Sequence, residues 1–164
     1  MILHSLREEH GVEPPQRFYL DFESAAMKAV RKIYPESSII GCDTHFKRTI
    51  RKNLQKKGLL KTYNQDSSLQ SFVRSLWALS LVPVDDVLSV WENFIKKNIP
   101  DSPEEEGNKI MEEFISYFEY CWVGAIHPRT GSRRKPLYRH DTWNKYDAVL
   151  HQQDTTTNRY CIVT

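Results

Sequence analysis

Apolar residues recur at helical spacing through the middle of this 164-residue chain. Phe46, Ile50 and Leu54 stand four residues apart and predict the inner side of one helix. Three longer apolar stripes predict further amphipathic helices: Leu69–Trp77, Val87–Ile95 and Ile110–Trp122. The tryptophans of these stripes lie among other apolar residues, so we expect them in the core rather than in contact with bases.

The pattern before residue 46 is different. Arg17–Phe22 is largely apolar on both faces and predicts a buried central strand. A helix is expected over Glu23–Tyr34, where Pro35 stops it, and Ser38–Cys42 predicts a second short strand. Because a helix connects the two strands, they should be parallel.

Together these elements predict an α/β protein that is mostly helical, with a short parallel β-α-β unit before a helical body. We expect a single domain over residues 1–164, since neither a repeat nor a flexible linker divides the chain. Its parts are a β-α-β-α unit at 11–58, a helical segment at 59–124, and a basic loop with a C-terminal tail at 125–164.

Positive charge is concentrated in two segments, although the formal net charge is only +2. No acid occurs between Asp43 and Asp66, and none between Ala125 and His140. The cations that we expect to contact nucleic-acid phosphates are Lys47, Arg48, Arg51, Lys52, Lys56 and Lys57 in the first segment and Arg133, Arg134 and Lys135 in the second. The alternative is a lysine-rich helix face that contacts only water.

Cysteine use and hydropathy predict a soluble intracellular protein. The three cysteines are widely spaced and do not resemble a disulfide framework. No apolar run approaches the roughly 18 residues that a bilayer requires, so we expect no membrane partner.

Asp21 is the first candidate for chemistry, because it ends the first predicted strand. A carboxylate at a strand end is a suitable ligand for Mg²⁺ or Mn²⁺ beside a phosphodiester. The competing interpretation is an N-cap, since a helix follows and Asp is a favoured cap.

Cys42 and His45 form the second candidate, a Cys-x-x-His where the second strand meets the next helix. A thiolate and an imidazole at this spacing suit half of a tetrahedral zinc site. The chain shows no second close pair of ligands, so a buried small cysteine and a hydrogen-bonding histidine at a helix start are the alternative.

The order of these motifs resembles the catalytic core of Mutator-like (MULE) transposases. The likeness consists of Asp21-Phe22-Glu23 after a strand, Gly41-Cys42-x-x-His45-Phe46 after the next, the helical stripes, and a Thr-Asn run near the end. It implies a ribonuclease-H-like core with an all-helical insertion, metal-dependent DNA cleavage and strand transfer, and a nuclear location. It also implies that Asp21 is the second acid of the catalytic triad.

Two acids of that triad have no counterpart here. The family pattern places the first on an earlier strand, and a glutamate beyond the Thr-Asn run is absent from this sequence. We therefore expect a catalytically incomplete fragment with residual DNA binding, which associates with missing transposase segments or with itself. The alternative is a non-catalytic helical module that binds nucleic acid or protein, with or without zinc on Cys42 and His45.

Overall fold

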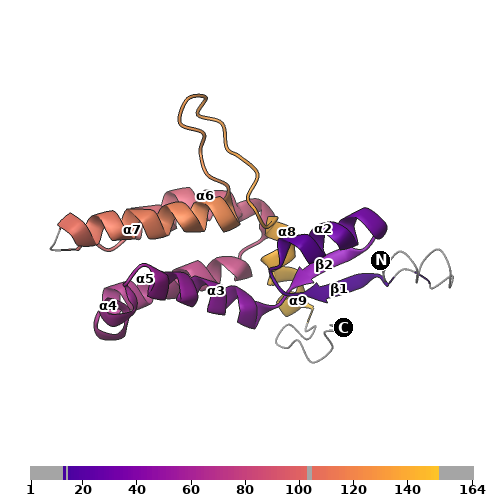
Figure 1. Ribbon diagram of the computed structural model, residues 1–164, viewed down its shortest axis with the longest axis horizontal. Coiled ribbons are helices and arrows are strands. Elements are labelled where there is room, and N and C mark those ends of the chain that lie inside the picture. The colour runs from indigo at the N-terminus through magenta and orange to yellow at the C-terminus, as the bar shows by residue number, and fades with distance from the viewer. Residues whose placement is uncertain (1–12, 14, 103–104, 152–164) are drawn as a thin grey trace.

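The computed structural model describes residues 13, 15–102 and 105–151. It is rich in α-helix and contains a small two-stranded parallel sheet, as the sequence predicts at this level. Figure 1 shows the sheet and its neighbouring helices at one end of the molecule and a longer helical body at the other. The Thr-Asn run of the resemblance lies outside the described residues.

The β-α-β unit has the predicted connectivity. Strand β1 (Arg17–Leu20) lies parallel to β2 (Ser38–Gly41), and α2 (Ser24–Ile33) connects them. The register pairs Leu20 with Gly41, so both strands end at the same edge. Met27 and Val30 of α2 pack on Ile39 of β2, which gives this unit a small apolar cluster of its own.

The prediction of a buried central strand is wrong for β1. Its residues alternate between exposed and half-buried, and Tyr19 has 41% of its surface exposed. The reason is that α2 covers a single face of the sheet, and within the described residues β1 pairs only with β2. Successive strand residues point to opposite faces, so Arg17 and Tyr19 lie on the face that α2 leaves open.

The helical body begins at Asp43, in a helix that was predicted as part of the β-α-β-α unit, and continues through residues predicted to be helical. Its regular helices are α3 (Asp43–Lys56), α4 (Leu60–Gln65), α5 (Ser67–Ala78), α6 (Val87–Val90) and α7 (Glu105–Phe118). Shorter pieces continue or connect them: the 3₁₀ turns η1 (Leu79–Leu81), η2 (Val84–Asp86) and η4 (Lys96–Asn98), and the π-helical turns η3 (Trp91–Ile95) and η5 (Glu119–Val123). In Figure 1, α3 to α5 lie on one side of this body and α6 and α7 on the other.

The core of the body follows the helical stripes. Phe46, Ile50 and Leu54 of α3 are fully buried, and so are Trp91 and Trp122. Burial of such large apolar side chains is the main favourable term in folding. The structure therefore confirms that these tryptophans belong to the core.

One predicted stripe is only partly correct. Val87, Trp91 and Ile95 point inward, whereas Leu88 and Phe94 are exposed, Phe94 by 61%. The segment passes from an α-helical turn into a π-helical one, whose hydrogen bonds run from i to i+5. A π-helical turn contains more residues than an α-helical turn, so different sequence positions face the core.

The chain after the body folds back toward the sheet. Gly124 has a φ of 100°, and a Cβ there would collide with the carbonyl oxygen of Arg134. The basic loop that follows is closed by an antiparallel bridge between Ile126 and Arg133, and it projects from the molecule in Figure 1. The short helices α8 (His140–Trp143) and α9 (Tyr146–Leu150) then lie beside the sheet.

An aromatic cluster connects the sheet to the helical body. Phe22, just after β1, contacts Trp122 and Tyr138 edge-on, with ring centroids 4.8 and 5.1 Å apart. Phe46 stacks on Trp143 at 5.3 Å, and the hydroxyl of Tyr138 donates to the carbonyl of Phe22 at 2.7 Å. The position of the strand ends therefore depends on these rings.

Every helix in the described part of the chain is too short or too polar to cross a lipid bilayer.

Candidate nucleic-acid interface and strand-end site

Asp21 directly follows β1, as the sequence predicts. The N-cap interpretation of this residue is wrong: α2 begins at Ser24, and Glu23 occupies its N-cap position. The backbone N–H of Glu23 donates to the carbonyl of Asp21 at 2.7 Å in the turn between strand and helix. The side chain of Asp21, 44% exposed, is thus not used to cap the helix.

The side chain of Asp21 lies against His45, a pairing that the sequence did not predict. Its Oδ1 is 3.0 Å from Nδ1 of His45, an ion-pair distance for a protonated imidazole, although the two atoms lack hydrogen-bond geometry. The sheet register creates the contact, because the N–H of Cys42 donates to the carbonyl of Leu20 at 3.1 Å. Since α3 begins one residue later, His45 in its first turn reaches the end of β1.

Cys42 is a buried free thiol at the N-cap position of α3. Cys121 is also free, and burial raises the pKa of its thiol to about 11. Among residues 13, 15–102 and 105–151, no three His, Cys, Asp or Glu side chains gather in an arrangement that could hold a metal ion. Zinc on Cys42 and His45, and Mg²⁺ or Mn²⁺ on Asp21, therefore stay predictions.

The cations of α3 lie on the outside of the molecule, opposite its buried apolar stripe. Lys47 pairs with Asp43 at 2.7 Å, and Lys57, just after the helix, pairs with Glu113 of α7 at 2.5 Å. This contact with Lys57 lowers the pKa of the Glu113 carboxyl. The remaining four predicted cations are exposed and form no ion pair within the described residues: Arg48, Arg51, Lys52 and Lys56.

The second group of predicted cations, Arg133, Arg134 and Lys135, does not continue the basic surface of α3. Arg133 is half-buried, and its guanidinium donates to the carbonyl of Gly124 and to the carboxylate of Glu92. Arg134 and Lys135 are exposed on the loop. Figure 1 shows this loop projecting beyond α6 and α7, on the side away from α3. The two basic segments therefore belong to different faces of the molecule.

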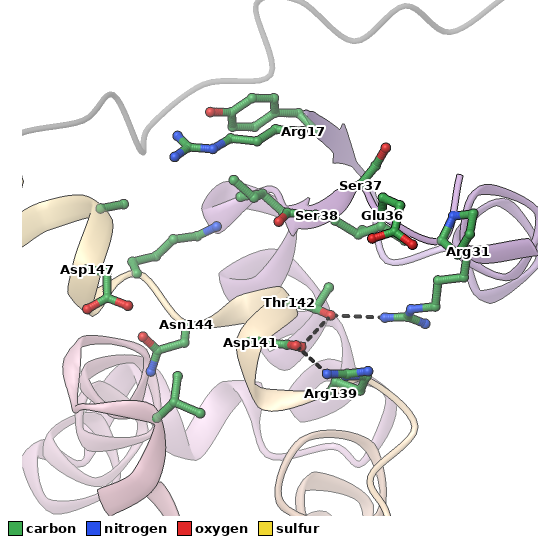
Figure 2. Close-up of a pocket in the computed structure, with 17 residues that line it drawn as sticks. Arg17, Arg31, Glu36, Ser37, Ser38, Arg139, Asp141, Thr142, Asn144 and Asp147 are labelled. Atoms are coloured by element: carbon green, nitrogen blue, oxygen red, sulfur yellow. Dashed lines mark hydrogen bonds and ion pairs between the residues drawn. The ribbon is translucent and has the colours of Figure 1, made fainter. Parts of the chain in front are cut away.

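Sequence reasoning missed one cation altogether, Lys145 between α8 and α9. Only 3% of its surface is exposed, and its ammonium donates to the carbonyl of Gly41 at the end of β2. Burial lowers the pKa of this lysine, an effect that nearby Asp43 and Cys42 oppose. Lys145 lines a cavity of 630 Å³ beside β2, shown in Figure 2. No pattern in the sequence distinguishes it from a surface lysine.

Comparison with known proteins yields no relative. No protein-family model, no curated protein and no solved structure matches this chain.

Proposed function

We propose that this chain binds DNA through the exposed face of α3, as part of a Mutator-like transposase core. The observation that carries the proposal is the group of four exposed cations, Arg48, Arg51, Lys52 and Lys56, on one helix beside the strand-end Asp21. No acid of the described chain neutralises them at ion-pair distance. Such a surface attracts a phosphate backbone by charge and by release of counterions.

The spacing of these residues suits contact with several phosphates of one strand. Arg48, Lys52 and Lys56 stand four residues apart and line one side of the helix, with Arg51 next to them. At 1.5 Å per residue, the row is about 12 Å long. Because these contacts would be to the backbone, we expect binding with little sequence preference.

We further propose that the chain does not cleave DNA by itself. Two-metal cleavage requires several carboxylates around the ions. Asp21 supplies one, and its neighbour at 3.0 Å is a histidine. In this proposal Mg²⁺ or Mn²⁺ would be held by Asp21 only together with acids that another segment contributes.

Fluorescence anisotropy with a labelled DNA duplex tests the binding proposal. In the fourfold variant R48Q/R51Q/K52Q/K56Q, affinity should fall roughly 30-fold, from about 0.5 kcal/mol for each exposed cation. A matched control removes four exposed lysines elsewhere, K28Q/K32Q/K97Q/K109Q, and changes the net charge equally. Circular dichroism confirms that both variants fold.

Two results would reject parts of the proposal. If both fourfold variants weaken binding equally, total charge and not α3 is responsible. If the wild-type chain nicks supercoiled plasmid in Mg²⁺ or Mn²⁺ and Asp21→Asn abolishes the nicking, the claim of incomplete catalysis is wrong.

A further inference from the structure

The cavity beside β2 has the size of a small-molecule site. It lies over the sheet face that α2 leaves open, since Arg17, Tyr19 and Ile40 line it from alternating strand positions. The loop between α8 and α9 forms the opposite wall with Asn144 and Lys145. Its volume of 630 Å³ falls within the range of pockets that hold cofactor-sized ligands.

Lys145 brings to this cavity a charge that forms no ion pair within the described residues. Its ammonium has three hydrogens to donate, and the described chain offers one acceptor, the carbonyl of Gly41. No carboxylate of the described residues lies within ion-pair distance of it. Asp43 is near enough to favour the charged form from beyond ion-pair distance, and an anion in the cavity would offset the remaining cost of burying the ammonium.

Arg31 of α2 is a second cation of the cavity that forms no ion pair within the described residues. Figure 2 shows its guanidinium reaching across to α8, where it donates to the hydroxyl of Thr142 at 3.1 Å. Arg139 on the same wall is different, because it pairs with Asp141 at 2.7 Å. Glu36 and Asp147 also line the cavity, but neither is within ion-pair distance of Arg31 or Lys145.

We propose that this cavity binds a phosphate monoester of nucleotide size, with its phosphate on Lys145 and Arg31. A guanidinium and an ammonium are the two groups that proteins use most to hold phosphate. Among the polar residues of the remaining lining, Tyr19, Ile40 and Val84 supply apolar surface that can contact the organic part of the ligand. This site is separate from the exposed face of α3 and does not depend on the proposed DNA binding.

Isothermal titration calorimetry with AMP, adenosine and inorganic phosphate tests this site. AMP should bind, and adenosine and inorganic phosphate should each bind at least about tenfold more weakly, because each lacks one of the two contacts. Lys145→Met and Arg31→Gln should each reduce AMP affinity by about tenfold or more. Lys28→Gln, an exposed cation of the same helix α2, is the matched control and should leave the affinity unchanged.

Several outcomes would overturn the site. Absence of AMP binding, equal binding of adenosine, or equal binding of inorganic phosphate would each contradict the proposed ligand. So would AMP affinity that is unchanged in both variants while their thermal melts show folded protein. Arg31→Gln keeps the test valid if Lys145→Met fails to fold, since Arg31 is only half-buried. The fourfold α3 variant should retain AMP binding, which separates this result from the DNA titration.

Discussion

The helical body and the β-α-β unit differ in how much apolar surface holds them in place. The body contains one continuous cluster that includes fully buried Phe46, Trp91, Phe114 and Trp122. The cluster of the β-α-β unit has three buried residues, and one face of its sheet carries exposed Tyr19. Asp21 follows a strand of the thinly packed unit, whereas the four exposed cations proposed to bind DNA lie on α3 of the body. The body therefore carries both most of the apolar packing and the proposed DNA-binding face.

The aromatic cluster packs the strand ends against the core of the helical body. Phe22 and Tyr138 contact both apolar clusters, and Trp122 contacts both of these rings. Loss of packing in the aromatic cluster should therefore lower the stability of the helical body and of the β-α-β unit together. Loss of packing inside the β-α-β unit should affect that unit alone.

The largest expected effect is that of Trp122→Ala. Removal of this fully buried ring should lower the free energy of unfolding by about 3–5 kcal/mol and destabilise both regions. Urea denaturation followed by circular dichroism measures it. Tyr120→Ala is the control, because that ring is 57% exposed and its loss should cost no more than about 0.5 kcal/mol. A similar effect of the two substitutions would contradict the assigned core.

Ile39→Ala should have a smaller and more local effect. The side chain fills the minor cluster with Met27 and Val30, so the loss should be about 2 kcal/mol, at the lower end for such substitutions. Hydrogen exchange should show that amides of β1 and β2 exchange faster in the variant, while those of α3 and α7 change little. Equal acceleration in both regions would show that the molecule unfolds as one unit.

His140 should make the junction between the regions sensitive to acid. Its Nε2 lies 3.0 Å from the carbonyl of Val123, and burial lowers its pKa, with that carbonyl and Asp141 opposing the shift and Arg133 adding to it. The unfolded chain thus binds a proton more readily than the folded one, so stability should fall as pH falls through the ordinary imidazole range, about 6.5.

Thermal melts between about pH 7.5 and 5.5 measure this dependence. His140→Gln should give a flatter profile than the wild type, whereas His151→Gln, an exposed control, should not. If the wild type is more stable at the acidic end, the assigned direction of the His140 shift is wrong.

The Asp21–His45 contact should contribute least to stability. Both side chains are partly exposed, so a double-mutant cycle with Asp21→Asn and His45→Gln should give a coupling energy below about 1 kcal/mol. Denaturant unfolding of the four proteins measures it. A coupling of several kcal/mol would mean that the pair is a structural element of the sheet end and not an accessible site.

Much of the fold follows from the sequence, because helical periodicity reports burial directly. The predicted stripe of Phe46, Ile50 and Leu54 is fully buried. The two strands are parallel, as the helix between them predicted. Phe94 was assigned wrongly, since a π-helical turn leaves no mark in an apolar pattern. The exposure of β1 was not predicted, because the composition of a strand does not reveal whether helices cover one face of its sheet or both.

The sequence named the candidate residues one by one, and their roles stay predictions, but it did not predict how they are arranged. Asp21 and His45 were separate candidates, and their contact depends on a strand register that the sequence does not specify. Arg133 was grouped with DNA-binding cations, but an internal contact with Glu92 uses its guanidinium. Lys145 was not a candidate, because burial of a lysine arises only from the tertiary fold.

The salt dependence of DNA binding tests the central claim most directly. Each phosphate contact contributes about −0.9 to the slope of log K against log salt, so the four exposed cations of α3 predict a slope of about −3.6. The variant R48Q/R51Q/K52Q/K56Q should bring that slope close to zero, and K28Q/K32Q/K97Q/K109Q should leave it unchanged. A wild-type slope near zero, or a steep slope that persists without the α3 cations, would contradict the account.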